Sequence, residues 1–356
     1  MKLDIRKLLR VMREKGASDM HITASAPVHL RIDERLYPAD KNILNPEDVR
    51  AGVYAILNEE QIKQFERDWE LDFSFEVEAL ARFRVNIFYQ RGSVGCAIRL
   101  IPFEIMSFEE CGLPARVAME LCRKPKGLVL ITGATGSGKS TTLASMIDFI
   151  NTNRECHIVT VEDPIEFVHR NKKAIVDQRE VYTDTHSFGA SLKHVLRQDP
   201  DVILIGEMRD LETIESALII AETGHLVFAT LHTSDAVQTV NRIIDVFPAH
   251  QQQQIRTQLS FVILGILSQQ LIPKAGRSGR ALATEVLMAT AAVRSLIREG
   301  KVHQIYSVIQ TSQRIGMKTM NQSLSDLCNG GLVSFEAAIQ KSTNTDELYK
   351  LIKGIS

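Results

Sequence analysis

The stretch "ITGATGSGKSTT", residues 131–142, is the strongest structural signal in the sequence. It follows the apolar run "GLVL" and fits the pattern G-x-x-x-x-G-K-[ST]. In such a strand, glycine-rich turn and helix, backbone N–H groups and the amino end of the helix surround a phosphate. The stretch therefore predicts a nucleotide-binding loop between a buried strand and a helix.

The residues of this loop have separate tasks. The glycines let the backbone approach phosphate, Lys139 reaches the terminal phosphates, and the hydroxyl of Ser140 can ligate a metal ion. We therefore expect ATP and Mg²⁺ as ligands. The residues expected to contact the nucleotide are Gly133, Ala134, Thr135, Gly136, Ser137, Gly138, Lys139, Ser140 and Thr141.

Length and composition describe an ordinary globular protein. A chain of 356 residues predicts about two domains. The formal charge of −1 supplies no general field for nucleic acid, so no nucleic-acid partner is expected. The 5 cysteines form no CxxC pair and are typical of reduced thiols in a cytoplasmic protein. The longest apolar run, residues 261–267, is far below the ~18 residues that span a bilayer, so any membrane contact should be peripheral.

Residues 1–100 predict a small α+β domain. An amphipathic helix begins near Ile5, and two extended segments flank Pro27. Helical patterns then cover 46–57 and 59–65, before strands in "LDFSFEV", "ARFRVNIFYQ" and "GCAIRLIP". Residues 101–114 contain two prolines and are the expected interdomain linker.

Residues 115–356 predict an α/β domain. Apolar strands are expected at 157–161, 202–205, 226–231 and 283–286, with helical patterns between them. This alternation is typical of a mostly parallel sheet covered by helices on both faces. From about residue 290 the signals are helical only.

Three acidic residues are candidates for the chemistry. In "DVILIGEMRD" a strand delivers Glu207 to its carboxyl end, where open parallel sheets bind ligands. We expect Glu207 to activate water and to help hold the metal ion. Gly206 stands where many such proteins have a metal-binding Asp, so Glu162 or Glu166 in "VEDPIEF" is expected to order metal or water. The alternative for these two acids is a solvated loop.

Basic and imidazole side chains are further candidates. His232 follows another predicted strand, where an imidazole can hydrogen-bond the γ-phosphate, whereas His225 is a structural alternative. Arg82 and Arg84 occupy one face of a strand, and Arg99 lies on the next strand. From the pattern alone, these arginines are typical of a solvated sheet face.

Four segments in one order carry a resemblance to a known family. "GATGSGKST", "VEDPIEF", "LRQDPDVILIGEMRDLET" and "AETGHLVFATLHT" resemble the Walker A, Asp box, Walker B and His box of the bacterial secretion and type IV pilus ATPases. The segments "GASDMHI", "RFRVNIF" and "AAVRSLIREGKVHQIYS" resemble those of the pilus retraction branch, which drives twitching motility. The resemblance spans most of the chain.

This resemblance implies a hexameric ring of subunits, each with a PAS-like domain followed by a RecA-like ATPase domain. It implies that Arg84 and Arg99, with Arg82 as a further candidate, reach nucleotide phosphates from the small domain. It also implies a γ-phosphate sensor at His232, an inner-membrane platform protein as partner, and a place at the pilus base. The expected activity is ATP hydrolysis that drives pilus retraction.

The sequence departs from the family pattern at two places. Residues 292–299 match the retraction-linked motif "AIRNLIRE", except that Val293 and Ser295 replace Ile and Asn. Ala134 replaces a proline that is frequent in the phosphate loop of the family, which should add flexibility there.

Several alternatives remain open at this point. A paralogous accessory retraction ATPase shares every motif. Pilus assembly and type II secretion ATPases usually have an extra amino-terminal region and a four-cysteine metal motif, and this sequence has no CxxC. A RecA-like nucleic-acid translocase and a nucleotide-gated regulator without turnover also share the phosphate loop.

Overall fold

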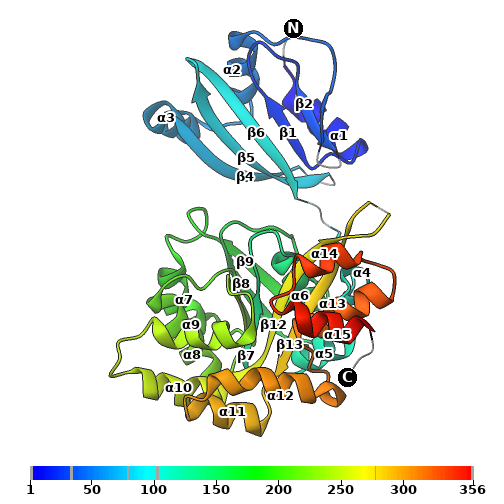
Figure 1. The fold of residues 1–356 in the computed structure, drawn as a ribbon. Helices are drawn as coiled ribbons and strands as arrows, with labels where there is room; N and C mark the ends of the chain where they lie inside the picture. The colour runs from blue at the N-terminus through cyan, green and yellow to red at the C-terminus, as the bar shows by residue number, and fades with distance from the viewer. Residues whose placement is uncertain (1–2, 33–34, 78–79, 102–103, 277, 354–356) are drawn as a thin grey trace. The chain divides into compact units, whose positions relative to one another are not determined.

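The computed structural model of the protein describes residues 3–32, 35–77, 80–101, 104–276 and 278–353. The chain forms two compact units that divide between Glu104 and Ile105. Each unit has its own sheet and its own core (Figure 1).

Over its described residues, the first unit is an antiparallel sheet with three helices. Its strand order is β3-β2-β1-β6-β5-β4. Asn45 and Asn58 cap two of the helices by accepting backbone N–H bonds, which fixes where those helices begin. The elements are α1 (Ile5–Glu14), β1 (Asp19–Ile22), β2 (His29–Ile32), β3 (Arg35–Pro38), α2 (Pro46–Tyr54), α3 (Glu59–Asp68), β4 (Glu70–Val77), β5 (Ala81–Gln90) and β6 (Ser93–Ile101).

Strand β5 shows why this sheet has one buried face. Phe83, Val85 and Ile87 are fully buried in a core that also includes Leu9 of α1. The alternate residues, among them Arg82 and Arg84, are only partly buried and lie on the opposite face. The predicted alternation is therefore confirmed.

The second unit is an α/β unit around a mixed sheet. Its strand order is β13-β12-β7-β11-β10-β8-β9, in which β12 and β13 are antiparallel and the other neighbouring strands of this order are parallel. Its strands are β7 (Gly127–Thr132), β8 (His157–Glu162), β9 (Ile175–Glu180), β10 (Val202–Ile205), β11 (Leu226–Leu231), β12 (Ile263–Pro273) and β13 (Arg280–Met288). Its longer helices are α5 (Ala115–Cys122), α6 (Lys139–Asn153), α7 (Phe188–Val195), α8 (Leu211–Glu222), α9 (Ala236–Asp245), α10 (Gln252–Val262), α11 (Ala291–Arg298), α12 (Ile305–Thr311), α13 (Met320–Asn329) and α15 (Thr345–Lys353). Short elements are α4 (Phe108–Cys111), α14 (Phe335–Ile339) and 3₁₀ turns at Leu196–Gln198, Val302–Gln304 and Gln313–Ile315.

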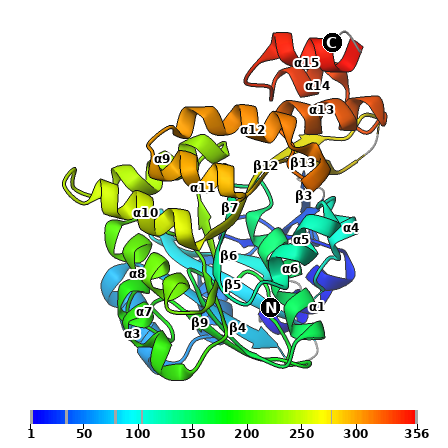
Figure 2. The same ribbon diagram turned by 90° about the horizontal axis from the view of Figure 1, so that it is seen from below.

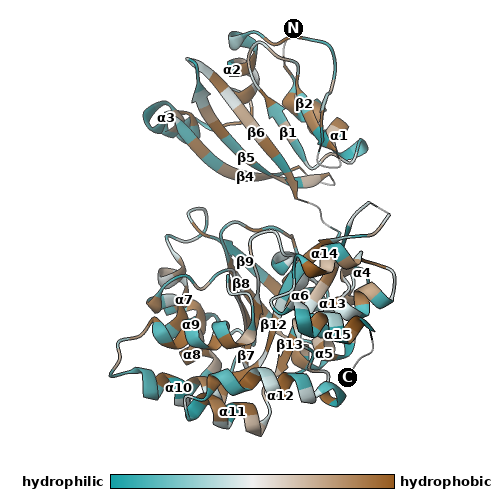
Figure 3. Cartoon of the chain, in the orientation of Figure 1, coloured by the Kyte–Doolittle hydropathy of each residue, from teal (hydrophilic) through white to brown (hydrophobic). Residues whose placement is uncertain are grey.

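Helices cover both faces of this sheet. The central strands β7, β10 and β11 are buried along their whole length, as strands sandwiched between helical layers must be. Figure 2 shows α5 and α6 on one side of β7, with α8 and α10 on the other. Figure 3 shows hydrophobic colour in the sheet around β7 and β12. The predicted parallel sheet is confirmed for β7 to β11.

Three features differ from the sequence expectations. The predicted linker 101–114 is shorter, because Ile101 ends β6 and Phe108 and Leu113 pack into the second core. Residues 102–103 lie outside the described residues. Strands β9 and β12 were not predicted, since β9 is a polar edge strand and β12 directly continues a helix.

The carboxyl-terminal helices form their own small core. Ile272 of β12 and Ala283 of β13 pack with Leu324 of α13 and Leu348 of α15, and Figure 1 shows α13, α14 and α15 grouped together. The helical character predicted from about residue 290 is confirmed. Over the described ranges, no helix has the length and apolar character needed to cross a bilayer.

Candidate active site

The phosphate loop occupies the predicted turn between β7 and α6. Gly133, Gly136 and Gly138 have φ values of 140°, 77° and 90°, which favour glycine. At Gly133 a Cβ atom would lie 2.5 Å from the carbonyl oxygen of Gln269 and 2.6 Å from Ser137 Oγ. Glycine is therefore required at this position both by backbone conformation and by the close approach of β12.

Lys139 lies within this loop. Its Nζ donates to the carbonyl oxygens of Gly133 at 2.8 Å and Ala134 at 3.1 Å. Burial lowers the pKa of Lys139, while the charges of Glu207 and Glu166 act in the opposite direction. The predicted loop, lysine and two acids are thus parts of one electrostatic site.

The strand order explains why these groups meet. Neighbouring strands β7, β11, β10 and β8 run parallel, so their carboxyl ends share one edge of the sheet. The phosphate loop follows β7, His232 follows β11, and Glu207 follows β10. Glu162 ends β8. Residues separated widely in sequence therefore lie along a single edge.

Glu207 is held by two side chains. Its Oε2 lies 2.8 Å from Arg209 Nη2, and its Oε1 lies 3.1 Å from His232 Nε2. Burial raises the pKa of Glu207, but the hydrogen bond from Arg209 and the proximity of His232 outweigh this effect, and the net shift is downward. Arg209 was missed as a site residue, although it stands two positions after Glu207 in "GEMRD".

Glu162 has a different environment. The Thr160 hydroxyl donates to Glu162 Oε1 at 2.7 Å, and Gln178 Nε2 donates to the same oxygen at 3.1 Å. Burial raises the pKa of Glu162 to about 7, and nearby Glu166 adds to the shift. Glu166 itself is exposed in the loop after β8. Gln178 belongs to the unpredicted strand β9, so sequence periodicity offered no signal for it.

Strand β8 passes so close to Gly206 that little room is left for a side chain at this position. A Cβ atom at Gly206 would lie 3.2 Å from Glu162 Cα and 3.2 Å from the carbonyl oxygen of Val161. The Asp that many related sites carry here would therefore press on the neighbouring strand. This contact supplies a physical reason for the departure seen in the sequence.

The remaining predicted residues lie elsewhere. The ring of His225 contacts the carbonyl oxygen of Ile220 at the end of α8, which agrees with a structural role. In the first unit, Arg84 pairs in register with Arg99 across β5 and β6. Arg99 Nε donates to Asp19 at 2.8 Å, and Arg82 donates to Ser74 at 2.7 Å.

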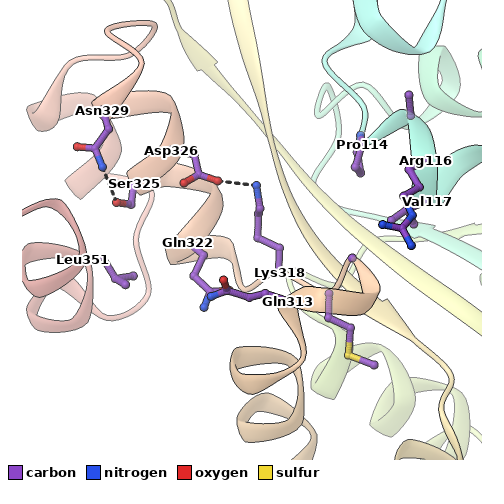
Figure 4. A pocket seen from close by; sticks show the side chains of 13 residues that line it. Pro114, Arg116, Val117, Gln313, Lys318, Gln322, Ser325, Asp326, Asn329 and Leu351 are labelled. Carbon is purple, nitrogen blue, oxygen red and sulfur yellow. Dashed lines mark hydrogen bonds and ion pairs between the residues drawn. The ribbon is translucent and has the colours of Figure 1, made fainter. Parts of the chain in front are cut away.

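A separate cavity of about 600 Å³ opens in the second unit. Its wall includes Arg116 of α5 and the ion pair between Lys318 and Asp326 (Figure 4). It shares no lining residue with the phosphate loop. Within the described part of the chain, no cluster of three or more His, Cys, Asp or Glu side chains is arranged to hold a metal ion.

The edge of the sheet thus combines the groups that phosphoryl transfer to water requires. A glycine loop and Lys139 can bind phosphate, and a carboxylate kept ionised can orient water. An exposed imidazole hydrogen-bonded to that carboxylate can respond to the γ-phosphate.

The chain is similar to known proteins along nearly its whole length. The family model for the Type II/IV secretion system protein matches residues 2–339. The chain is 48% identical to the type IV pilus retraction ATPase PilT of Pseudomonas aeruginosa, over 96% of this chain and 98% of that protein. It is 42% identical to the type IV pilus ATPase PilU of the same organism, over 99% of this chain and 92% of that protein.

A solved structure is also similar. A crystal structure of the pilus retraction motor PilT with bound ADP aligns with a TM-score of 0.92 at 50% identity, covering 98% of this chain and all of that one. The predicted fold class, a RecA-like ATPase unit preceded by a PAS-like α+β unit, is confirmed by this alignment. With its family model matched along nearly the whole sequence, the chain belongs to the Type II/IV secretion system protein family.

Proposed function

We propose that this protein is a hexameric motor that hydrolyses Mg-ATP to drive type IV pilus retraction. The observation that carries the proposal is the contact of Glu207 with His232 and Arg209 on the strand edge that also bears the phosphate loop. The relatives named above, a retraction ATPase and a retraction motor with bound ADP, support the same activity.

Glu207 orients the attacking water and accepts its proton. Because Arg209 and His232 keep its pKa below the usual range, Glu207 is ionised at neutral pH. A carboxylate of this kind is a weak base, but phosphoryl transfer depends more on positioning and charge stabilisation than on base strength. His232 contacts Glu207, and a γ-phosphate bound beside Glu207 would lie within reach of its imidazole, so nucleotide occupancy would be communicated to the β11–α9 loop.

The donor set fits a magnesium ion. Ser140 supplies a half-buried hydroxyl in the first turn of α6, and Glu207 supplies a carboxylate. Mg²⁺ at such sites takes most of its ligands from phosphates and water, so a large protein cluster is not needed. Ser140 and Glu207 would hold the ion, Glu162 or Glu166 would order its water, and the ion would supply positive charge that stabilises the phosphates during transfer.

Each site is completed by a neighbouring subunit in the proposed ring. Arg84 and Arg99 are adjacent on two strands, and both lie on the sheet face opposite the core of the first unit. Arg84 has no ion-pair partner among the described residues. Like-charged neighbours on one face are suited to an anion supplied from outside, here the nucleotide phosphates of the next subunit.

The motor works at the pilus base. It is a cytoplasmic homo-hexamer that contacts an inner-membrane platform protein and touches the membrane only peripherally. ATP closes the contact between subunits, and hydrolysis with phosphate release opens it, so interdomain rotation is transmitted to the platform. No nucleic acid is involved.

Replacing Glu207 by Gln in the native host tests the direction of work. Without its carboxylate the motor should lose phosphate release by about 100-fold or more, and surface pili should accumulate while twitching stops. Phosphate release and pilus counts by electron microscopy measure these effects. The control is Glu215→Gln, because Glu215 is exposed on α8.

Other outcomes assign other functions. Bald cells would identify a pilus-assembly motor. Equal and negligible phosphate release from wild type and variant would identify a nucleotide-gated regulator, and turnover stimulated by DNA would identify a translocase. Unchanged pili despite lost turnover would favour an accessory retraction ATPase, which the similarity to PilU over 99% of the chain makes the second candidate.

A further inference from the structure

Glu285 is a buried carboxylate that the proposed mechanism does not use. It lies in β13 with 3% of its surface exposed. No salt bridge to Glu285 occurs among the described residues. Burial of an acid without a cationic partner is unfavourable unless hydrogen bonds replace the lost water, so its contacts require an explanation.

Two helix amino ends meet at this carboxylate. Glu285 Oε1 accepts the backbone N–H of Ala236 at 2.8 Å, and the backbone N–H of Met320 lies near enough to the carboxylate to lower its pKa. Ala236 is the first residue of α9, and Met320 is the first residue of α13. The free N–H groups of a helix amino end carry partial positive charge, so one acid can serve both helices.

The α9 contact fixes the end of the loop that carries His232. This loop covers residues 232–235, between the last residue of β11 and the first of α9. The hydroxyls of Thr233 in this loop and Thr239 in α9 form a hydrogen bond of 2.7 Å, and the side chain of Asp235 caps the amino end of α9. Because His232 is exposed and contacts Glu207, its position depends on where the two ends of this short loop are held.

The α13 contact ties the same point to the carboxyl-terminal helices. Next to Glu285, the Thr284 N–H donates to Ser323 Oγ at 2.9 Å, and Val286 exchanges backbone hydrogen bonds with Lys318. Helix α13 also lines the cavity in Figure 4. Glu285 thus lies where strand β13 packs against α13.

A buried polar row leads from Glu285 to the phosphate loop. Glu285 pairs in register with Ser268 of β12, which pairs with Thr132 of β7. The Thr132 hydroxyl donates to Ser268 Oγ at 2.8 Å, and Thr132 directly precedes Gly133. Directly paired residues project to the same face of a sheet, so this row is continuous.

We propose that Glu285 is a positioning residue for His232: by joining the amino ends of α9 and α13 to one point on β13, it fixes the loop 232–235 in the geometry that hydrolysis needs. The inference rests on the proposed ATPase function. It assigns to Glu285 no contact with nucleotide, so its effect must pass through His232.

A double-mutant cycle on the full-length protein tests this assignment. Glu285→Gln keeps the shape of the side chain but removes the negative charge and one of the two acceptor oxygens that face the amino ends of α9 and α13. It should lower kcat by about 10-fold, with KM for Mg-ATP nearly unchanged, because displacement of a catalytic group by about 1 Å can cost up to 100-fold. In a His232→Ala background the same change should alter kcat less than about twofold. An equal loss in both backgrounds, or no loss, would overturn the proposal.

Hydrogen exchange supplies a readout that does not need turnover. In Glu285→Gln, backbone amides of the loop 232–235 and the first turn of α9 should exchange faster than in wild type, while ADP affinity is retained. Unchanged exchange would refute the inference even if the protein hydrolyses ATP. Lack of wild-type turnover with faster exchange in the variant would instead remove the proposed function and retain the loop-fixing contact. Glu336→Gln is the matched control, because Glu336 is exposed on α14.

Discussion

Three glutamates show how one side-chain type acquires different chemistry in this protein. Burial acts on each of them, but the net pKa shift depends on the partners. Arg209 and His232 lower the pKa of Glu207, whereas Glu162 and Glu285, without a cation in contact among the described residues, have pKa values raised to about 7. Only Glu207 is therefore held firmly as an anion at neutral pH.

Glu285 should make the stability of the second unit depend on pH. Burial, and secondarily the charge of Asp235, raise its pKa, while N–H groups of Ala236 and Met320 oppose the shift; Tyr306 is a further titratable neighbour. The pKa of Glu285 in the folded protein exceeds the unfolded value of 4.5. The contribution of Glu285 to the free energy of unfolding is therefore fully present below pH 4.5 and is lost as pH rises through 7. Between pH 5 and 8, wild type should lose roughly 2–3 kcal/mol more unfolding free energy than Glu285→Gln. Denaturant unfolding at several pH values measures this, and parallel curves for the two proteins would contradict it.

At the scale of elements, the edge strand β9 holds the acidic loop after β8. Gln178 donates to Glu162 Oε1 and to the carbonyl oxygen of Phe167, and accepts the N–H of His169 at 2.7 Å. Two positions along β9, Glu180 accepts the N–H of Ile165 at 3.2 Å. Side chains on one face of β9 therefore fasten the loop that carries Glu166.

Replacing Gln178 by Leu should loosen this loop. The change leaves Glu162, Phe167 and His169 each without one hydrogen-bond partner, so the free energy of unfolding should fall by about 2 kcal/mol. Amides of residues 163–169 should also exchange faster with solvent. Denaturant unfolding and hydrogen exchange measure both effects. Ile175→Thr on the same strand is the control, because Ile175 is 58% exposed; equal behaviour of the two variants would refute the role of Gln178.

At the scale of the whole molecule, the chain carries the two halves of its proposed site on separate units. Lys139 belongs to the unit after residue 104, and Arg84 belongs to the unit before it. A ring of head-to-tail contacts can combine the lysine of one subunit with the arginine of the next. A site shared between two subunits can be distinguished from a site within one chain by mixing two variants, each of which lacks one half of the site.

Mixing two inactive variants should restore turnover. Lys139→Ala and Arg84→Ala rings should each be inactive, but in a mixed ring an Arg84→Ala subunit still has Lys139 and can receive Arg84 from a Lys139→Ala neighbour. Random mixing in equal amounts should complete about a quarter of the sites. Phosphate release after co-refolding or co-expression measures this, with hexamers verified by light scattering. Absence of recovery in verified mixed hexamers would contradict a shared site.

Much of this protein could be predicted from local sequence. The strand, glycine turn and helix at residues 127–153 follow from apolar residues, positive-φ glycines and a helix amino end that lie next to one another in the chain. The alternation in β5 and the apolar runs of β10 and β11 are likewise local. The two-unit organisation, the fold class and the family follow from such signals taken in order.

Contacts between strands that are distant in sequence could not be predicted, because they depend on how the chain folds in three dimensions. The order β7, β11, β10, β8 and β9 differs from chain order, so no periodicity reveals that Arg209 and His232 share Glu207, or that Gln178 holds Glu162. Glu285 looks like an ordinary polar residue in an apolar strand until two helix amino ends are seen to converge on it. Local sequence determines secondary structure because its forces act between near neighbours, whereas hydrogen bonding and pKa at the site depend on groups that only folding brings together.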